Sequence, residues 1–228
     1  MSGIVTETVQ LNDGASVLYL PYREEYVTFT TKESWEVFGM DWLKERIVKE
    51  GVVLSDQVLK LDALLTHQVD PALIMDMGRE FAARFKESGV TKVVTLESSG
   101  ISVAFAAALE LGVPMVFARR KKTLLADPDA LCERVPSFTK GIVTDIMVSR
   151  QFIGEGDKVL FIDDIIANGD AARGLIKIID RAGAELIGLG VVIEKSFQAG
   201  ARTLREQHVH VESLVTISSL EGGKISFS

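Results

Sequence analysis

Residues 159–171 read VLFIDDIIANGDA and join a buried strand to a helix through a short polar turn. Four apolar residues are followed by Asp163 and Asp164, and a turn with Gly169 leads into a helix that begins near Asp170. Two like charges a few ångströms apart repel, so the acidic pair must be solvated or hold something cationic. The turn presents free backbone N–H groups at the positive end of a helix, a geometry that binds phosphate. The stretch therefore predicts a phosphate loop beside two carboxylates.

Helices and strands alternate on both sides of this stretch. Apolar runs predict buried strands at residues 91–98, 113–119, 158–164 and 184–195. The segments between them predict helices at residues 70–89, 100–112, 171–183 and 198–207, the first with Asp70 as its N-cap. This alternation predicts an α/β fold with a mostly parallel central sheet covered on both faces. Ligands bind beyond the carboxyl ends of such strands, where the polar segments 97–100, 119–122 and 163–171 fall.

Composition and charge exclude several classes of protein. The chain has 228 residues, of which 47% are hydrophobic and 25% charged, as in an ordinary globular protein. Its one cysteine, Cys132, rules out an internal disulfide and favours a cytoplasmic location. No apolar run reaches the roughly 20 residues that span a bilayer, so we expect no membrane partner. A net charge of −7 disfavours binding to nucleic acid, although a local basic cluster can still attract a small anion.

The quoted loop resembles the 5-phosphoribosyl 1-pyrophosphate (PRPP) motif of the type I phosphoribosyltransferases. Other segments resemble the bacterial members of this family that use xanthine: EGVVLSDQVLKLDALLTHQVDP (50–71), TLESSGI (95–101), VFARRKK (116–122), PSFTK (136–140) and VVIEKSFQAGA (191–201). The resemblance runs from about Met40 to the last residue. It implies the type I phosphoribosyltransferase fold, in which helices flank a mostly parallel sheet that carries a small hood and a flexible lid.

The phosphate loop departs from the commonest family pattern. Many type I enzymes carry Thr-Gly-Gly-Thr where this chain has Asn168, Gly169, Asp170 and Ala171. Without a hydroxyl at Ala171, a phosphate depends more on backbone donors. A carboxylate aimed at a phosphate would repel it, so we expect Asp170 to turn outward or to cap its helix.

The resemblance also implies which residues hold PRPP. Asp163 and Asp164 would be the catalytic pair, which binds the ribose diol and stabilises the positive charge that grows on the sugar as pyrophosphate leaves. The 5′-phosphate would lie on Ala167, Asn168, Gly169, Asp170 and Ala171. The pyrophosphate would lie on Glu97, Ser98, Ser99 and Gly100, with Arg119 and Lys121 from the basic run and with Mg²⁺ brought by PRPP. No residue is assigned as a direct metal ligand.

The purine site is predicted around Lys195, just past the last apolar strand. Its ammonium can donate to a 6-oxo oxygen but cannot accept from a 6-amino group, which favours 6-oxopurines over adenine. The resemblance implies that Leu59 and Thr66 complete the pocket from the hood. In relatives an amide side chain often stands where Thr66 does, so the choice between xanthine and guanine stays open.

The predicted organisation has two parts. Residues 1–39 suggest two or three short strands and have no counterpart in the resemblance. Their role is open, and one interpretation makes them a dispensable extension ahead of an alternative start at Met40. Residues 40–228 form the phosphoribosyltransferase domain, with a hood at about 40–70 and a lid at about 122–149. The resemblance further implies a homodimer.

The expected activity is transfer of the 5-phosphoribosyl group from PRPP to N9 of xanthine in purine salvage, giving xanthosine 5′-monophosphate (XMP) and pyrophosphate. One alternative is a guanine/hypoxanthine phosphoribosyltransferase. Another is a PRPP-sensing transcriptional regulator of purine genes, which would need a basic helical module ahead of the domain. Residues 1–39 contain only Arg23 and Lys32 as basic side chains and show no helix-turn-helix pattern.

Overall fold

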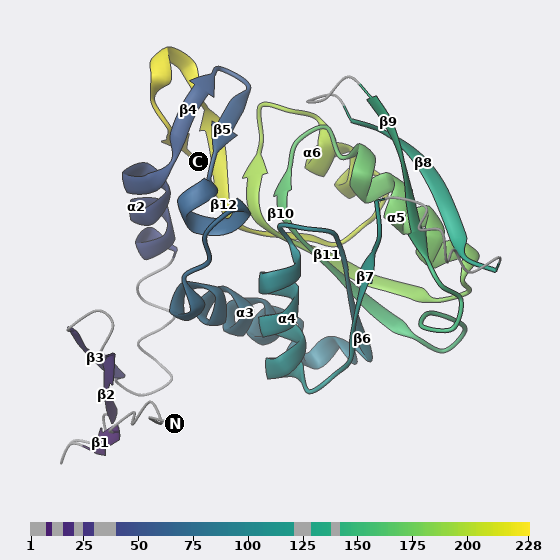
Figure 1. Cartoon of the computed structure of the whole chain (residues 1–228), viewed down its shortest axis with the longest axis horizontal. Helices are drawn as coiled ribbons and strands as arrows, with labels where there is room; N and C mark the ends of the chain where they lie inside the picture. Colours follow the sequence, from purple (N-terminus) through teal and green to yellow (C-terminus); the bar gives the residue numbers. More distant parts are fainter. Residues whose placement is uncertain (1–7, 11–15, 21–24, 30–39, 121–128, 138–141) are drawn as a thin grey trace. The chain divides into compact units, whose positions relative to one another are not determined.

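The structure, a computed structural model, describes residues 8–10, 16–20, 25–29, 40–120, 129–137 and 142–228. It divides into two compact units, Met1–Trp42 and Leu43–Ser228. The first unit contains a three-stranded antiparallel sheet in the order β1-β2-β3, drawn in purple in Figure 1. Its strands are β1 (Thr8–Gln10), β2 (Ser16–Leu20) and β3 (Glu25–Phe29). The short strands predicted before residue 40 are therefore confirmed.

The second unit is built on a six-stranded sheet in the order β13-β12-β11-β10-β6-β7. All neighbouring pairs are parallel except β12 and β13, which confirms the predicted sheet. The strands are β6 (Lys92–Leu96), β7 (Met115–Ala118), β10 (Lys158–Ile166), β11 (Glu185–Lys195), β12 (Val211–Ser219) and β13 (Ser226–Phe227).

Strand β10 is longer than predicted, because it does not end at the acidic pair. Ile165 and Ile166 continue the ladder by pairing with Ile193 and Glu194 of β11. Both are β-branched residues, which favour a strand. Asp163 and Asp164 therefore lie inside the strand.

Helices cover both faces of the sheet. Figure 1 shows α3 (Pro71–Phe85) and α4 (Ile101–Leu111) together on one side and α5 (Asp170–Arg181) on the other. The short α6 (Gly200–Glu206) follows β11. Helix α3 begins as predicted, because the Asp70 carboxylate accepts the N–H groups of Ala72 and Leu73. In the described part of the chain, no helix is both long and apolar enough to cross a bilayer.

The two faces of β11 explain why its sequence reads as a continuous apolar run. On the α3 side, Gly188 and Gly190 leave room for the rings of Phe85 and Phe81, which would lie 2.6 and 2.7 Å from a Cβ atom at these glycines. On the opposite side, Val191 and its neighbours pack into the core with the buried face of α5. A strand buried on both faces carries no polar alternation.

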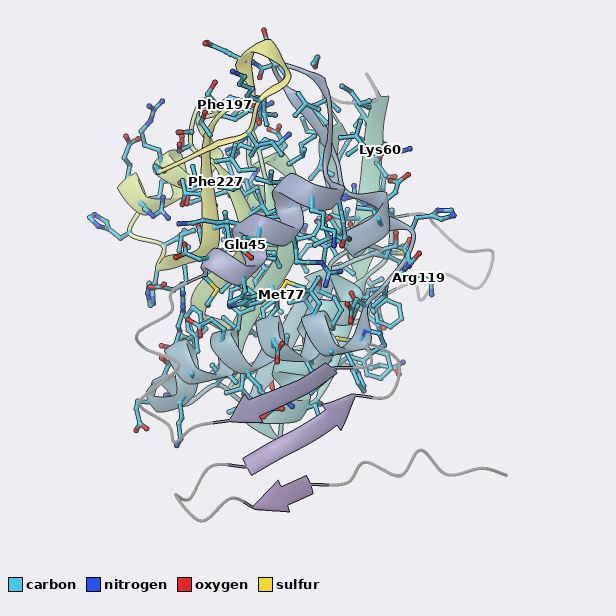
Figure 2. All side chains as sticks on the ribbon, turned by 90° about the vertical axis from the view of Figure 1, so that its left-hand side faces the viewer. Glu45, Lys60, Met77, Arg119, Phe197 and Phe227 are labelled. Atoms are coloured by element: carbon cyan, nitrogen blue, oxygen red, sulfur yellow. The ribbon has the colours of Figure 1, made fainter. Side chains whose placement is uncertain are left out.

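The predicted hood corresponds to elements from both ends of the second unit. It consists of α2 (Asp41–Glu50), β4 (Val52–Ser55), β5 (Val58–Lys60) and η1 (Asp62–Thr66), and β4 packs beside the C-terminal η3 (Glu221–Gly223). The ammonium of Lys44 lies 6.0 Å from the ring centroid of Phe227, which Figure 2 labels. The C-terminus of the chain thus helps to hold the N-terminal helix of the unit.

The described part of the predicted lid is a hairpin of β8 (Leu131–Ser137) and β9 (Ile142–Val148). The side chains of Val135 and Ile146 are buried in the core shared with α5. Val135 packs so closely on α5 that a Cβ atom at Gly174 would collide with it. These strands therefore belong to the packed core. The predicted lid residues 122–128 and 138–141 lie outside the described residues.

Candidate active site

A cavity of about 590 Å³ opens where β10 and β11 end. Its wall contains the loop that follows β10, the side chain of Asp163 and the side chain of Lys195. Gln57 and Val58 contribute from the turn between β4 and β5, and Pro136 contributes from β8. The structure thus brings together the predicted phosphate loop, one of the two aspartates and the predicted purine-binding lysine.

The phosphate loop has backbone N–H groups that form no hydrogen bond within the described part of the chain, whereas its carbonyl oxygens already accept hydrogen bonds. Among the described residues, we find no acceptor for the N–H groups of Asn168, Gly169, Asp170, Ala171 and Ala172. Three successive carbonyl oxygens are in contrast occupied. Ala167 O accepts from Gly200 N at 3.0 Å, Asn168 O from Arg173 Nη1 at 3.0 Å, and Gly169 O from Arg173 N at 2.9 Å. A loop with free donors and occupied acceptors at the start of a helix is suited to bind an anion.

The position of Asp170 differs from both of our expectations. Gly169, with a left-handed φ of 78°, occupies the N-cap position, and Asp170 is the first residue of α5. The Asp170 side chain is only 17% exposed, so it does not turn outward, and it forms an ion pair of 2.6 Å with Arg173 Nη2. An arginine one helical turn later supplies the countercharge at the spacing that favours such pairs.

A second chain segment supports the loop from outside. Gly200, at the start of α6, donates its N–H to Ala167 O. A Cβ atom at Gly200 would collide with that oxygen and would lie 2.6 Å from Gly169 N. The close approach of these two backbones therefore requires glycine at position 200.

The two aspartates are neighbours on β10, and their side chains lie close enough to interact with each other. Asp163 lines the cavity, whereas Asp164 is not among its lining residues. Asp163 Oδ1 accepts the N–H of Asp164 at 3.0 Å. Burial, and then the charge of Asp164, raise the pKa of Asp163 well above its ordinary value, against smaller opposing contributions from that N–H group and from Arg120.

The predicted pyrophosphate turn, residues 97–100, lies against Asp163. A Cβ atom at Gly100 would be 2.9 Å from Asp163 Oδ1 and 2.6 Å from the buried hydroxyl of Thr95, so this approach also requires glycine. The Glu97 carboxylate accepts Arg120 N at 2.7 Å and pairs with Arg119 Nε at 2.7 Å. Glu97 thus fixes the two arginines. Ser98 and Ser99 lie in the same turn, after a cis peptide bond between Glu97 and Ser98.

Of the two arginines, Arg120 lines the cavity. Arg119 lies at the surface with its guanidinium 5.7 Å from the ring centroid of Phe117, and Figure 2 labels it. Phe117 is partly exposed and Ala118 is buried, so alternation along β7 places Arg120 on the inner side. The assignment of Arg119 to the pyrophosphate stays a prediction, and the structure adds Arg120 as a residue of the cavity wall. Lys121 lies outside the described residues.

Lys195 ends β11 and is 7% exposed. Its ammonium donates to Gln57 O at 2.8 Å, and Gln198 Nε2 donates to Gln57 Oε1 at 2.8 Å. Burial lowers the pKa of Lys195. The neighbouring Glu194 does not neutralise it, because both Glu194 oxygens bind Arg205 at 2.7 and 2.8 Å. Among the described residues, no carboxylate pairs with Lys195, so its remaining donors are available to a ligand.

Leu59 and Thr66 are not among the residues that line this cavity. Leu59 is buried at 7% exposure, and Thr66 is exposed, with its hydroxyl donating to Asp62 Oδ1 at 2.8 Å. Their assignment to the purine pocket stays a prediction. Sequence reasoning also missed Gln57 and Gln198, which approach Lys195 from segments far apart along the chain.

Comparison with known proteins identifies the class of protein that this fold and site define. Residues 68–219 match the family described as Phosphoribosyl transferase domain. The chain belongs to the phosphoribosyltransferase family.

Within this family the chain is similar to proteins named xanthine phosphoribosyltransferase. It is 54% identical to the one from Moorella thermoacetica over 188 residues, which cover 82% of this chain and 96% of the relative. It is 53% identical to the one from Bacillus cereus strain G9842, over 82% of this chain and 95% of the relative.

Solved structures of adenine phosphoribosyltransferases share the fold. The one from Rhodothermus marinus has a TM-score of 0.64 at 28% identity, covering 78% of this chain and 98% of that chain. The one from Saccharomyces cerevisiae has a TM-score of 0.62 at 23% identity, covering 76% of this chain and 99% of that chain, which shows the fold alone.

Proposed function

We propose that the chain transfers the 5-phosphoribosyl group from PRPP to N9 of xanthine and releases XMP and pyrophosphate. The observation that carries the proposal is the position of Lys195. A buried ammonium that has no carboxylate partner among the described residues lines the same cavity as the phosphate loop and an aspartate. The similarity to xanthine phosphoribosyltransferases supports the choice of xanthine over guanine and hypoxanthine.

Different residues of the cavity act on the 5′-phosphate, the ribose and the pyrophosphate of PRPP. The free N–H groups after β10 bind the 5′-phosphate and thereby fix the ribose. Asp163 lies beside the sugar and stabilises the positive charge that develops as the bond to pyrophosphate breaks. Arg120, held by Glu97, lines the same cavity and neutralises the departing pyrophosphate.

Lys195 selects the purine. A 6-oxo group accepts a hydrogen bond from its ammonium, whereas the 6-amino group of adenine would leave the buried donor without an acceptor. The adenine phosphoribosyltransferases that share this fold therefore inform the sugar-phosphate side of the site and not its purine preference.

The test is a turnover assay with purified protein, PRPP, Mg²⁺ and each of xanthine, guanine, hypoxanthine and adenine. We expect the highest kcat/KM with xanthine and none measurable with adenine. A preference for guanine or hypoxanthine would support the alternative activity. The absence of turnover with every 6-oxopurine would overturn the proposal.

We expect Gly200→Ala to raise the KM for PRPP by about 10-fold or more, with a smaller change in the KM for xanthine, because small displacements of a binding group are costly. The new Cβ atom must push the Ala167 carbonyl and the Gly169 N–H away from their positions. Steady-state kinetics with each substrate varied in turn measure the effect.

Gly154→Ala is the matched control for this substitution. Gly154 has no atom within 4 Å of its Cβ position and no positive φ, so alanine fits there without strain. Equal KM values for PRPP in both variants would show that contact between Gly200 and the loop does not position the phosphate.

Mg²⁺ fits this site as a companion of PRPP. Among the described residues, no three His, Cys, Asp or Glu side chains form a metal-binding group. Mg²⁺ commonly uses one or two carboxylates together with phosphate oxygens of a substrate. Asp163 supplies such a carboxylate beside the positions we assign to ribose and pyrophosphate. When bound, the ion would neutralise charge on the leaving pyrophosphate, and removal of Mg²⁺ by a chelator is expected to abolish turnover until Mg²⁺ is restored.

We also propose that the chain forms a homodimer, as its family resemblance implies. Helix α4 leaves Phe105 and Leu109 57% and 59% exposed, and Phe117 of the adjacent edge strand β7 is 39% exposed. Contiguous exposed apolar side chains mark an interface. We expect a dimer by sedimentation velocity and a shift to monomer for Phe105→Glu with Leu109→Glu. Phe152→Glu, at a side chain that is also 57% exposed and belongs to neither α4 nor β7, is the control.

A further inference from the structure

The phosphate loop contains the carboxylate of Asp170, whose negative charge opposes the binding of an anion to the same loop. Asp170 stands in the row of free N–H groups, lines the cavity and is 17% exposed. An ionised carboxylate within a few ångströms of a phosphate repels it strongly in a partly desolvated site. Unless its charge is cancelled, Asp170 would oppose the binding that its own backbone N–H promotes.

Arg173 contacts the loop at three successive residues. Its Nη2 pairs with Asp170 Oδ1 at 2.6 Å, and its Nη1 donates to Asn168 O at 3.0 Å. The backbone N–H of Arg173 donates to Gly169 O at 2.9 Å. Arg173 is not among the residues that line the cavity, so it acts from behind the loop.

These contacts combine charge cancellation with control of the backbone. Because the planar guanidinium carries several donors in a fixed geometry, it can bind a carboxylate and a carbonyl at the same time. The carbonyl of Asn168 is thereby engaged by Arg173, while Gly200 engages the carbonyl of Ala167. The N–H groups of the loop are left without acceptors among the described residues.

We propose that Arg173 is a positioning residue of the ribose 5′-phosphate site, which cancels the charge of Asp170 and holds the carbonyl of Asn168. The inference rests on the proposed function in taking the ligand of this loop to be a sugar phosphate. It explains how a loop with an aspartate in place of a neutral residue still binds an anion.

The test measures binding of ribose 5-phosphate to the whole protein by calorimetry, together with the KM for PRPP. Arg173→Gln is expected to weaken ribose 5-phosphate binding by about 10-fold or more, because Asp170 loses its countercharge. Asp170→Asn combined with Arg173→Gln is expected to recover most of the affinity. Arg173→Lys keeps the charge with fewer donors, so it should lie between the wild type and Arg173→Gln.

The pattern of rescue separates a charge effect from a merely structural one. If Arg173 only stabilised the helix, the double variant would bind as weakly as Arg173→Gln, and this result would overturn the inference. The control is Arg79→Gln, which breaks a comparable ion pair of 3.0 Å with Asp76 on α3, away from the cavity. We expect no change in ribose 5-phosphate binding for this control.

The same measurements keep this inference apart from the proposed function. Wild-type turnover of a 6-oxopurine with unchanged ribose 5-phosphate binding in Arg173→Gln would overturn the role of Arg173 alone. Weakened binding that Asp170→Asn rescues would support that role even if the wild-type protein turned over no 6-oxopurine.

Discussion

Replacing both Asp163 and Asp164 with asparagine is expected to lower kcat by about 10³-fold or more, because a preorganised charge is worth most where charge develops in the transition state. Asp163 lines the cavity and Asp164 does not, so Asp163→Asn should account for the larger share. The KM for PRPP should change much less than kcat if the interaction is made mainly in the transition state. Single-turnover kinetics of the two single variants and the double variant measure how much each aspartate contributes to the rate of the chemical step.

The same substitution is expected to stabilise the folded protein at neutral pH. Burial and the charge of Asp164 raise the pKa of Asp163, so the folded protein holds this proton more tightly than the unfolded chain does. The stability of the wild type therefore falls as pH rises from about 4, the ordinary aspartate pKa, through the raised pKa. Asparagine removes this loss. The gain in stability should grow as pH rises from about 4 through the raised pKa of Asp163, and it should vanish as pH falls to about 4.

Asp145→Asn serves as the control for the acidic pair. Asp145 lies on β9 and pairs with the exposed Arg134, away from the lining of the cavity. We expect it to leave kcat unchanged. A double variant at the acidic pair that kept wild-type kcat would show that the two carboxylates do not act on the transition state.

The secondary structure of the main unit could be predicted because its signals are local. Asp70 and Pro71 mark the start of α3, and its side-chain cap forms as the residue types require. The continuous apolar run of β11 predicts a strand buried on both faces. The end of β10 was less predictable, because Ile165 and Ile166 extend it only by pairing with a neighbouring strand.

The candidate site was predictable where its residues share one segment. The loop of residues 167–171 follows its strand directly, and Lys195 ends the next strand, so one rule about parallel sheets places both at the same edge. The contacts of Gly200 with Ala167 and of Gln57 with Lys195 join segments that no local pattern connects. Arg173 was partly predictable. Its spacing from Asp170 can be read from the sequence, whereas its hydrogen bond to the Asn168 carbonyl can be seen only in the structure.

Replacing Lys195 with methionine is expected to lower kcat/KM for xanthine by about 10²-fold or more, because the 6-oxo oxygen loses a charged donor in a buried site. The KM for PRPP should stay close to that of the wild type, because Lys195 ends β11 and is not part of the phosphate loop of residues 167–171. Methionine has a similar length, so it fills the space of the lysine stem. Steady-state kinetics with each of the four purines measure the effect.

The pH dependence of stability gives Lys195→Met a second, independent readout. Burial lowers the pKa of Lys195, so between this lowered value and about 10.4 the unfolded chain binds more protons than the folded protein. Wild-type stability therefore rises with pH across that window, and the charged Lys195 costs stability below it. The methionine variant should be at least as stable as the wild type at about pH 7 and should lose this advantage above about pH 10.

Lys177→Met is the control, because it removes an exposed lysine from α5 without touching the cavity. It should leave the purine preference unchanged. If Lys195→Met lost activity equally with PRPP-saturated xanthine, guanine and hypoxanthine, the ammonium would read the 6-oxo group that these purines share. A variant that kept wild-type kcat/KM for all three would instead place the purine away from Lys195, and the selection against adenine would need another source.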